Sequence, residues 1–276
     1  MTKTIVITGA NGFIGRFLIE FFSKRGYHVI SLIHRAYKAA LPGVEYRLFD
    51  MDSFAGDVIP QNAAAVIHAA YIPYKKGNNS EARNLKATQR LLNIARKKNT
   101  GKFVFLSSFS AADDALSHYG KNKYELEQLF DEKRDLVLRP ALVTGDGGLY
   151  KNLVKIIEGS RIIPLIGGGK QPVQTVKVET LAEVIAAGIE KNISGFYDIA
   201  EDKAITMREL YEKIAKRNSK RISFFTIPYF LAAPLVFLLE NFSAKPLITK
   251  ENLDGLRKMK ERDCSALKDV FEINLK

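Results

Sequence analysis

The chain has 276 residues, and 42 lysines and arginines against 30 aspartates and glutamates give it a formal net charge of +12. Hydrophobic residues make up 46% and charged residues 26%, which is typical of a globular protein with one large α/β unit or two smaller domains. The single cysteine, Cys264, excludes an internal disulfide and a cysteine-based metal cluster and suits a reducing compartment. The first residues do not resemble a signal peptide, so we expect a cytoplasmic protein.

The positive charge is spread along the chain rather than gathered in one run. Basic clusters occur at 96–102, 216–221 and 257–262. This pattern favours a solvated basic surface and no nucleic-acid partner, with an anionic substrate or membrane surface as the alternatives. The four histidines lack metal-ligand spacing, so we expect no metal.

Apolar runs and amphipathic segments alternate over the first half of the chain. Strand-like runs occur at 4–9, 28–33, 65–70, 103–108 and 136–145. Helix-length segments lie at 14–22, 84–99 and 119–133. The alternation predicts an α/β fold, a Rossmann-type doubly wound parallel sheet with helices on both faces.

The pattern changes after residue 145. Glycine-rich loops surround a helix at 149–159, and a strand at 173–178 and a helix at 179–191 then restore the earlier style. We expect a dinucleotide-binding domain over 1–199, with a glycine-rich excursion at 145–172, and a smaller, mostly helical substrate cap over 200–276.

The stretch "TGANGFIGRFL" (8–18) places three glycines between the first strand and the first helix, with the spacing G-x-x-G-x-x-G. Glycine permits a tight strand-to-helix turn and lets backbone N–H groups approach a pyrophosphate at the positive end of the helix. The position and spacing predict a dinucleotide site.

The end of the second strand bears on the choice of cofactor. An NAD-preferring site usually has an acidic residue there, whereas this strand runs into His34 and Arg35. Arg35, helped by His34 or Arg16, would hold a 2′-phosphate through charge-assisted hydrogen bonds. We therefore favour NADP(H), with NAD(H) as the alternative.

Tyr119 and Lys123 lie four residues apart and share one face of a predicted helix. A neighbouring ammonium would lower the pKa of the Tyr119 phenol and make it an acid/base near neutrality. The other tyrosine and lysine with this spacing, Tyr71 and Lys75, enclose Pro73 and are not expected to form a helix.

These motifs, in this order, resemble the extended branch of the short-chain dehydrogenase/reductase superfamily, the NAD-dependent epimerase/dehydratase family. The resemblance covers nearly the whole chain and implies three catalytic residues, Ser108, Tyr119 and Lys123. It implies a cofactor site formed, besides Tyr119 and Lys123, by Gly9, Asn11, Gly12, Phe13, Ile14, Gly15, His34, Arg35, Asp50, Met51, Ala69, Ala70, Tyr71, Asn84, Pro140 and Val143.

The resemblance implies hydride transfer to or from a sugar carbon, with Tyr119 as acid/base. The interval between Ser108 and Tyr119 is short and has no Asp-Glu pair after the serine, which argues against sugar dehydration. We expect an NADPH-dependent reductase of a keto group on a nucleotide-linked or lipid-linked sugar. A 4-epimerase that retains NAD and a non-catalytic dinucleotide-binding sensor or assembly factor are the alternatives.

The stretch at 222–239 contains 18 residues without a charge, interrupted by Pro228 and Pro234. We expect a buried cap helix there, with an interfacial helix as the alternative. An interfacial helix would bring the protein to the inner face of a membrane, as a lipid-linked substrate would require. A homodimer is also compatible with the sequence.

Overall fold

The computed structural model of the chain describes residues 2–35, 41–75, 77–201, 203–242 and 249–273. Its centre is a seven-stranded sheet in the order β11-β6-β5-β4-β1-β2-β3, and all neighbouring strands are parallel. The strands are β1 (Thr4–Thr8), β2 (His28–Ile33), β3 (Val44–Leu48), β4 (Ala65–His68), β5 (Lys102–Leu106), β6 (Leu136–Pro140) and β11 (Gly195–Ile199).

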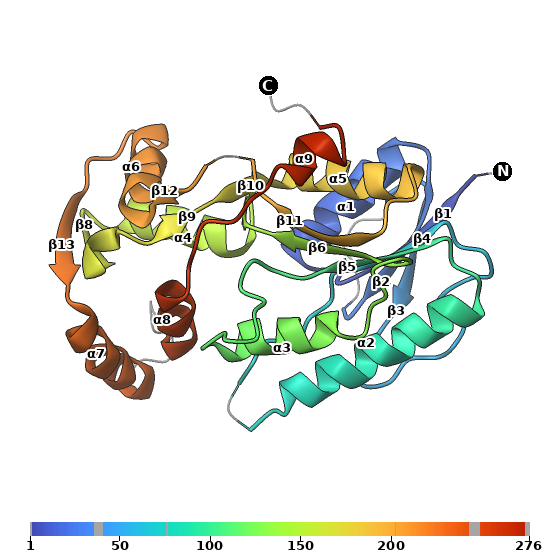
Figure 1. Cartoon of the computed structure of the whole chain (residues 1–276), viewed down its shortest axis with the longest axis horizontal. Helices are drawn as coiled ribbons and strands as arrows, with labels where there is room; N and C mark the ends of the chain where they lie inside the picture. The colour runs from blue at the N-terminus through green and yellow to red at the C-terminus, as the bar shows by residue number, and fades with distance from the viewer. Residues whose placement is uncertain (1, 36–40, 76, 202, 243–248, 274–276) are drawn as a thin grey trace.

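Helices cover both faces of this sheet (Figure 1). One face carries α1 (Phe13–Lys24), α5 (Val178–Glu190) and α9 (Ala266–Asp269), and the other carries α2 (Ser80–Lys97) and α3 (His118–Glu127). Each face has its own apolar core, and the central strands are buried on both sides, as parallel sheets require. The prediction of a doubly wound α/β fold is confirmed.

A smaller unit lies beyond one end of the sheet (Figure 1). It contains α4 (Gly148–Gly159), β8 (Ile162–Ile166), η1 (Gly167–Gly169), β9 (Pro172–Val173), β12 (Ile205–Thr206), α6 (Met207–Arg217), β13 (Ser223–Ile227), α7 (Tyr229–Phe242) and α8 (Lys250–Arg257). Its core joins α4 to α6 through residues such as Ile157 and Ile214.

Side-chain packing crosses the predicted domain boundary at residue 199 in both directions. Ile157 of the first range packs in the core of the smaller unit, whereas Leu267 and Phe271 of the second range pack in the core of the large sheet. The segment between α8 and α9 runs from the smaller unit back to the sheet (Figure 1). The boundary itself stays a prediction.

Several predicted elements differ in detail from the observed ones. The run at 136–145 is divided, because β6 ends at Pro140 and β7 (Leu142–Thr144) pairs with β10 (Thr175–Lys177) outside the large sheet. The second helix starts earlier, at Ser80, and α3 ends at Glu127 rather than near residue 133.

The apolar stretch at 222–239 is not one helix. Its first part is β13, which pairs with β8, and α7 begins only after Pro228. Ala232 and Val236 of α7 are buried against α8, whereas Phe230 and Leu231 are exposed. Within the described residues, the helices all fall short of the length and hydropathy that a transmembrane segment needs.

Candidate active site

The glycine turn follows β1 at the point where the strand order reverses, between β1 and β4, which is where open α/β sheets bind ligands. Gly9 has a φ of +69°, and a Cβ there would lie 2.6 Å from the carbonyl carbon of Ala69. A Cβ on Gly15 would lie 2.3 Å from the carbonyl oxygen of Gly9. Both positions therefore exclude any side chain, because the opposing atoms belong to the backbone.

The first-turn backbone amides of α1 have no side-chain hydrogen-bond acceptor from the N-cap residue. Gly12 is the N-cap and has no side chain to accept from the first-turn amides, and the first turn contains no acidic residue. Unsatisfied amides and the positive end of the helix dipole are a site for an anion. This local chemistry, together with the turn that excludes side chains, fits a dinucleotide pyrophosphate.

The ends of β1 and β4 are tied by a buried hydroxyl. Thr8 Oγ1 accepts from the backbone amides of Ala69 and Ala70, both at 3.1 Å, and lies 2.7 Å from Nδ1 of His68. Burial lowers the pKa of His68 to about 3, so the ring is neutral, and its Nε2 lies 3.0 Å from Thr88 Oγ1. His68 is therefore a structural residue at the end of β4.

Asn11 connects the glycine turn to the end of β2. Its Oδ1 accepts from the backbone amides of His34 (2.8 Å) and Arg35 (3.2 Å), and its Nδ2 donates to the Arg35 carbonyl. His34 and Arg35 are exposed beside the turn. The structure thus brings Asn11, His34 and Arg35 together, and Asn11 uses its amide on the protein backbone.

Tyr119 meets Ser108 at the carboxyl edge of the sheet. Ser108 lies just beyond the end of β5, and Tyr119 is in the first turn of α3, whose N-cap is Ser117. The Ser108 side chain, as a hydrogen-bonding neighbour, lowers the pKa of the Tyr119 phenol, but burial has the larger effect and raises that pKa above its ordinary value. The two groups meet at one point, where a substrate oxygen would contact both.

Lys123 lies one turn further along α3 and is buried. Its Nζ donates to the carbonyl oxygen of Leu106 at 2.7 Å and lies 4.8 Å from the centre of the Tyr71 ring and 5.9 Å from that of Tyr119. Burial lowers the pKa of Lys123 to about 7. The pKa of the Tyr119 phenol is raised rather than lowered, so the expectation that the Lys123 ammonium lowers it is wrong. Burial removes water from both groups, and its effect on the phenol is the largest one.

Tyr71 joins the glycine turn to the Tyr119 and Lys123 pair. It follows β4, two residues after the Ala69 that touches Gly9, and its ring meets that of Tyr119 edge to face, with centroids 5.1 Å apart. Burial raises the pKa of Tyr71, so its phenol is neutral. The other tyrosine and lysine spacing is confirmed as non-helical, because Lys75 lies in the loop before α2.

The remaining predicted cofactor residues are arranged around this edge. Phe13 packs so closely under the glycines of 145–148 that a Cβ on Gly147 would lie 2.4 Å from its ring. Asp50 is exposed after β3, and Asn84 is buried and holds the backbone of Ile72 in both directions at 2.9 Å. The others lie in or beside the elements already described: Ile14 in α1, Met51 after β3, Pro140 at the end of β6 and Val143 in β7.

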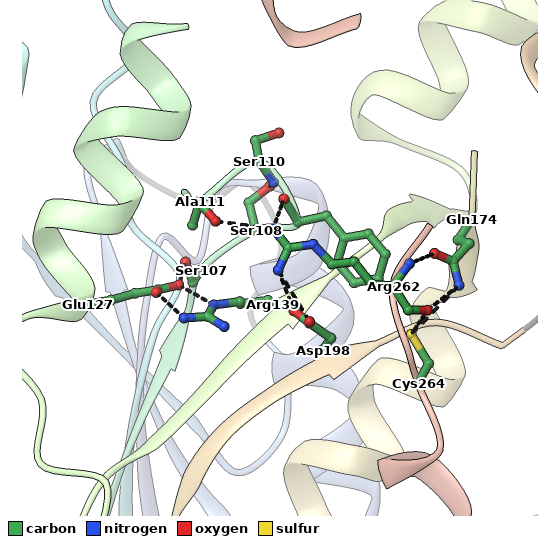
Figure 2. Close-up of polar contacts among 11 residues, drawn as sticks. Ser107, Ser108, Ser110, Ala111, Glu127, Arg139, Gln174, Asp198, Arg262 and Cys264 are labelled. Carbon is green, nitrogen blue, oxygen red and sulfur yellow. Dashed lines mark hydrogen bonds and ion pairs between the residues drawn. The ribbon is translucent and has the colours of Figure 1, made fainter. Parts of the chain in front are cut away.

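A buried charge network beneath the site was not predicted from the sequence. Glu127 of α3 is fully buried and accepts from Arg139 at 2.8 and 2.5 Å and from the Ser107 hydroxyl at 2.5 Å (Figure 2). Glu127 also holds the pKa of Lys123 above the value that burial alone would give. Its i, i+4 spacing from Lys123 is the sequence signal that would have identified it.

A second unpredicted group borders the site at His118. Its Nδ1 lies 2.6 Å from Glu81 Oε1, and its ring stacks on Tyr74 with centroids 3.8 Å apart. His118 is the first residue of α3 and directly precedes Tyr119. The pairing with Glu81 depends on the contact between α2 and α3, which local spacing does not reveal.

The fold and these contacts define a Rossmann-type protein of the short-chain dehydrogenase/reductase class. A family model described as "NAD dependent epimerase/dehydratase family" matches residues 5–200, and the chain belongs to that family. It is thus an oxidoreductase or epimerase of this superfamily, as the motifs predict.

The chain is similar to three proteins with different names. A Dictyostelium discoideum protein named NADH dehydrogenase [ubiquinone] 1 alpha subcomplex subunit 9, mitochondrial, is 25% identical and aligns over 90% of this chain and 74% of its own. An Escherichia coli O157:H7 N-acetyl-alpha-D-glucosaminyl-diphospho-ditrans,octacis-undecaprenol 4-epimerase is 23% identical over 53% of this chain and 51% of its own. The structure of MoeE5 with UDP-glucuronic acid and NAD shares the fold, with a TM-score of 0.74 at 19% identity over 99% of this chain and 94% of MoeE5.

Proposed function

We propose that the protein reduces a keto group on a nucleotide-linked or lipid-linked sugar, with Tyr119 as the acid. The observation that carries this proposal is the placement of the half-buried Tyr119 beside Ser108, whose side chain acts on the phenol and lowers its pKa. A phenol whose pKa is raised stays protonated near neutrality, which suits donation to an alkoxide that forms at a carbonyl carbon. Ser108 would donate a hydrogen bond to the same oxygen.

A nicotinamide dinucleotide would be held at the start of α1. Gly9, Gly12 and Gly15 would allow its pyrophosphate to approach the backbone, and Tyr71 and Lys123 would lie beside the ring end. When bound, this cofactor supplies or accepts hydride at the reacting carbon. Lys123 would donate to the nicotinamide ribose and orient Tyr119.

Arg35 and His34 support NADP(H) as the preferred cofactor, with NAD(H) as the alternative. Both side chains are exposed beside the glycine turn, and β2 ends without a carboxylate. A guanidinium would pair with a 2′-phosphate that NAD(H) lacks. The family description and the NAD bound in MoeE5 support NAD(H). Dissociation constants of NADPH and NADH for the wild type and for Arg35→Glu, measured by fluorescence, decide between the two.

The names of similar proteins support a sugar substrate. MoeE5 was solved with UDP-glucuronic acid, and the Escherichia coli relative is named for a polyprenyl-diphosphate sugar. A panel of UDP-sugars and their keto derivatives, assayed with NADPH and NADH, tests the proposal, with Tyr119→Phe as the control. Turnover that is equal in both proteins, or absent from both, contradicts it.

The 4-epimerase with retained NAD is the second candidate, and the name of the Escherichia coli relative favours it. An epimerase must first oxidise its sugar, which requires Tyr119 as a base. Denaturing the purified protein and identifying the released nucleotide separates the two reactions. NAD in stoichiometric amount supports the epimerase, and an empty site that binds NADPH supports the reductase.

A non-catalytic role is favoured by the Dictyostelium relative, which is named as a subunit of NADH dehydrogenase. A dinucleotide site can persist without its chemistry, so this chain would then serve as a sensor or assembly factor. The arrangement of Ser108, Tyr119 and Lys123 supports the enzyme instead. Binding of NADPH without turnover of any sugar in the panel would favour the non-catalytic role.

Exposed apolar side chains on the smaller unit support a lipid-linked substrate at a membrane surface. Phe225 of β13 is 50% exposed, and Phe230 and Leu231 of α7 are 77% and 50% exposed. Co-sedimentation with vesicles of phosphatidylcholine, with and without phosphatidylglycerol, measures this association. A double Phe225→Ser, Phe230→Ser variant is the control, and equal sedimentation of both proteins removes the support.

A further inference from the structure

Three residues of the C-terminal part, Glu251, Lys258 and Arg262, contact the segment that carries Ser108 and Tyr119. This segment, residues 107–119, connects β5 to α3 and contains the β5–α3 loop. Arg262 contacts the start of the loop, Lys258 forms an ion pair with Asp114 at 2.6 Å, and Glu251 contacts the start of α3. The partners are more than 130 positions apart in the sequence.

Arg262 holds the loop directly after Ser108. Its Nη2 donates to the carbonyl oxygens of Phe109 (2.6 Å) and Ala111 (3.1 Å), and its Nη1 pairs with Asp198 of β11 at 3.1 and 3.2 Å (Figure 2). The side chain of Arg262 is only 13% exposed. A planar guanidinium satisfies a carboxylate and two carbonyls at once, which a lysine ammonium cannot reproduce.

The backbone of Arg262 is itself fixed to the protein. Gln174 accepts from the Arg262 amide at 2.8 Å and donates to its carbonyl at 3.1 Å (Figure 2). Gln174 lies between β9 and β10, and it is buried. The guanidinium is therefore held from two sides, by Gln174 through the backbone and by Asp198 through the side chain.

The loop that Arg262 grips places the Ser108 hydroxyl. The amide of Ser110 donates to Ser108 Oγ at 3.1 Å, and the amide of Ala111 donates to the Ser108 carbonyl at 3.0 Å. Phe109 is anchored by its amide to the carbonyl of Pro140 at 3.1 Å. With its oxygen accepting from Ser110, the Ser108 hydroxyl has its proton available for Tyr119 or a substrate oxygen.

Glu251 holds the other end of the segment. Its carboxylate accepts from the amides of His118 (3.0 Å) and Tyr119 (3.2 Å) in the first turn of α3, where a negative charge is favoured by the helix dipole. The pair of Lys258 and Asp114 is exposed and contributes little.

We infer that Arg262 is a positioning residue, which fixes the distance between the Ser108 hydroxyl and the Tyr119 phenol by holding carbonyls 109 and 111, and that Glu251 fixes the same distance from the α3 end. This inference rests on the proposed roles of Ser108 and Tyr119. The side chains of Arg262 and Glu251 thereby connect the C-terminal part of the chain to the segment 107–119.

Amide hydrogen exchange of the full chain tests this inference without any substrate. In Arg262→Lys we expect exchange of a peptide covering 107–114 to rise about tenfold, with peptides of α2 unchanged, because the loop opens locally. Arg257→Lys, the same substitution at an exposed position of α8, is the matched control and leaves both peptides unchanged. Unchanged exchange at 107–114, or an equal rise in α2, overturns the inference.

Kinetics provide the second readout, with whichever sugar the panel shows to be turned over. Arg262→Lys should lower kcat about tenfold and leave KM for the cofactor unchanged, since it moves Ser108 and not the glycine turn. A parallel change in both constants contradicts a positioning role. If Arg262→Lys does not fold, Asp198→Asn serves in its place and should raise exchange at 107–114.

The two proposals fail separately. If Tyr119→Phe retains full activity while Arg262→Lys still loosens 107–114, the proposed function fails and the coupling stands. If Tyr119→Phe is inactive while exchange at 107–114 is unchanged in Arg262→Lys, the function stands and the positioning role of Arg262 fails.

Discussion

The Nζ of Lys123 lies 2.7 Å from the carbonyl oxygen of Leu106, at the end of the strand that leads to Ser108. The amine also lies 4.7 Å from the centre of the Phe105 ring and 4.8 Å from that of Tyr71. One carbonyl and two aromatic faces replace the water that an exposed ammonium would have. This environment lowers the pKa of Lys123 to about 7 and makes the side chain sensitive to pH in the range where the enzyme would work.

The stability of the protein should therefore rise with pH more steeply than that of Lys123→Met. The folded-state pKa of about 7 lies below the ordinary value of 10.5, so the unfolded chain binds more protons between these values. The penalty of burying the ammonium is fully present below pH 7 and is lost as the pH rises toward 10.5. Urea unfolding at pH 6.5, 8 and 9.5 measures the free energy of unfolding of both proteins. Between pH 6.5 and 9.5 we expect the wild type to gain about 1–3 kcal/mol more than Lys123→Met. Parallel pH curves for the two proteins would contradict the lowered pKa.

Tyr119→Phe should abolish turnover without unfolding the protein. The substitution removes the proton that the phenol would donate, and loss of one general acid costs about 10²–10⁴-fold in rate. The ring remains to pack against Tyr71, so the melting temperature should change little. Steady-state kinetics and thermal unfolding of the same preparation measure the two effects. Tyr74→Phe, near the site but outside the catalytic set, should retain activity.

Ser108→Ala should shift the pH profile to higher pH as well as slow the reaction. The Ser108 side chain lowers the pKa of Tyr119, so its removal leaves only the rise due to burial. Reduction needs the protonated phenol, so the alkaline limb of the pH profile for reduction should move to higher pH. Oxidation needs the phenolate, so the acid limb of the pH profile for oxidation should also move to higher pH. The profile of kcat/KM, extended above pH 10 because the pKa of Tyr119 is raised from its ordinary value of 10.0, measures the shift. A lower rate with an unmoved profile would mean that Ser108 does not contact the phenol during the reaction.

The sequence predicts the centre of the sheet well and its two edges poorly. The runs of β1 and β2 are buried on both faces and read as continuous apolar strands. The strands that the sequence does not reveal, β3 "VEYRL" and β11 "GFYDI", are the two edge strands in the sheet order. Their side chains are half-buried and include charged groups, so hydrophobicity marks them only weakly.

The residues of the candidate site that lie close together in the sequence could be predicted, and the distant ones could not. Ser108, Tyr119 and Lys123 lie within 16 residues of one another, and the glycine turn is local, so motif spacing identifies both. Arg262 contacts Phe109 from 153 positions away, and this contact depends on how the smaller unit returns to the sheet. No local pattern in "KERDCS" distinguishes an arginine that grips a loop from one on a solvated surface.

Gly15→Ala should destabilise the protein much more than Gly12→Ala. A Cβ on Gly15 would lie 2.3 Å from the Gly9 carbonyl oxygen, whereas a Cβ on Gly12 would lie 3.1 Å from the same atom. We expect the free energy of unfolding to fall by about 3 kcal/mol in Gly15→Ala and by about 1 kcal/mol in Gly12→Ala. Gly56→Ala, at a position with open space around it, is the matched control. Urea unfolding gives the three values, and similar costs at residues 12 and 15 would show that α1 shifts to relieve the contact.

Arg139→Met should lower the free energy of unfolding more than the double variant Arg139→Met, Glu127→Gln, which removes both charges of the pair. Glu127 is fully buried and is paired with Arg139, so loss of the guanidinium leaves a carboxylate without its counter-ion. We expect a loss of about 3–5 kcal/mol in the free energy of unfolding. Adding Glu127→Gln should restore part of it, because the amide still accepts from the Ser107 hydroxyl and carries no charge. Urea unfolding of the single and double variants measures this recovery, and additive losses would mean that packing of the Arg139 stem, rather than the buried charge, dominates.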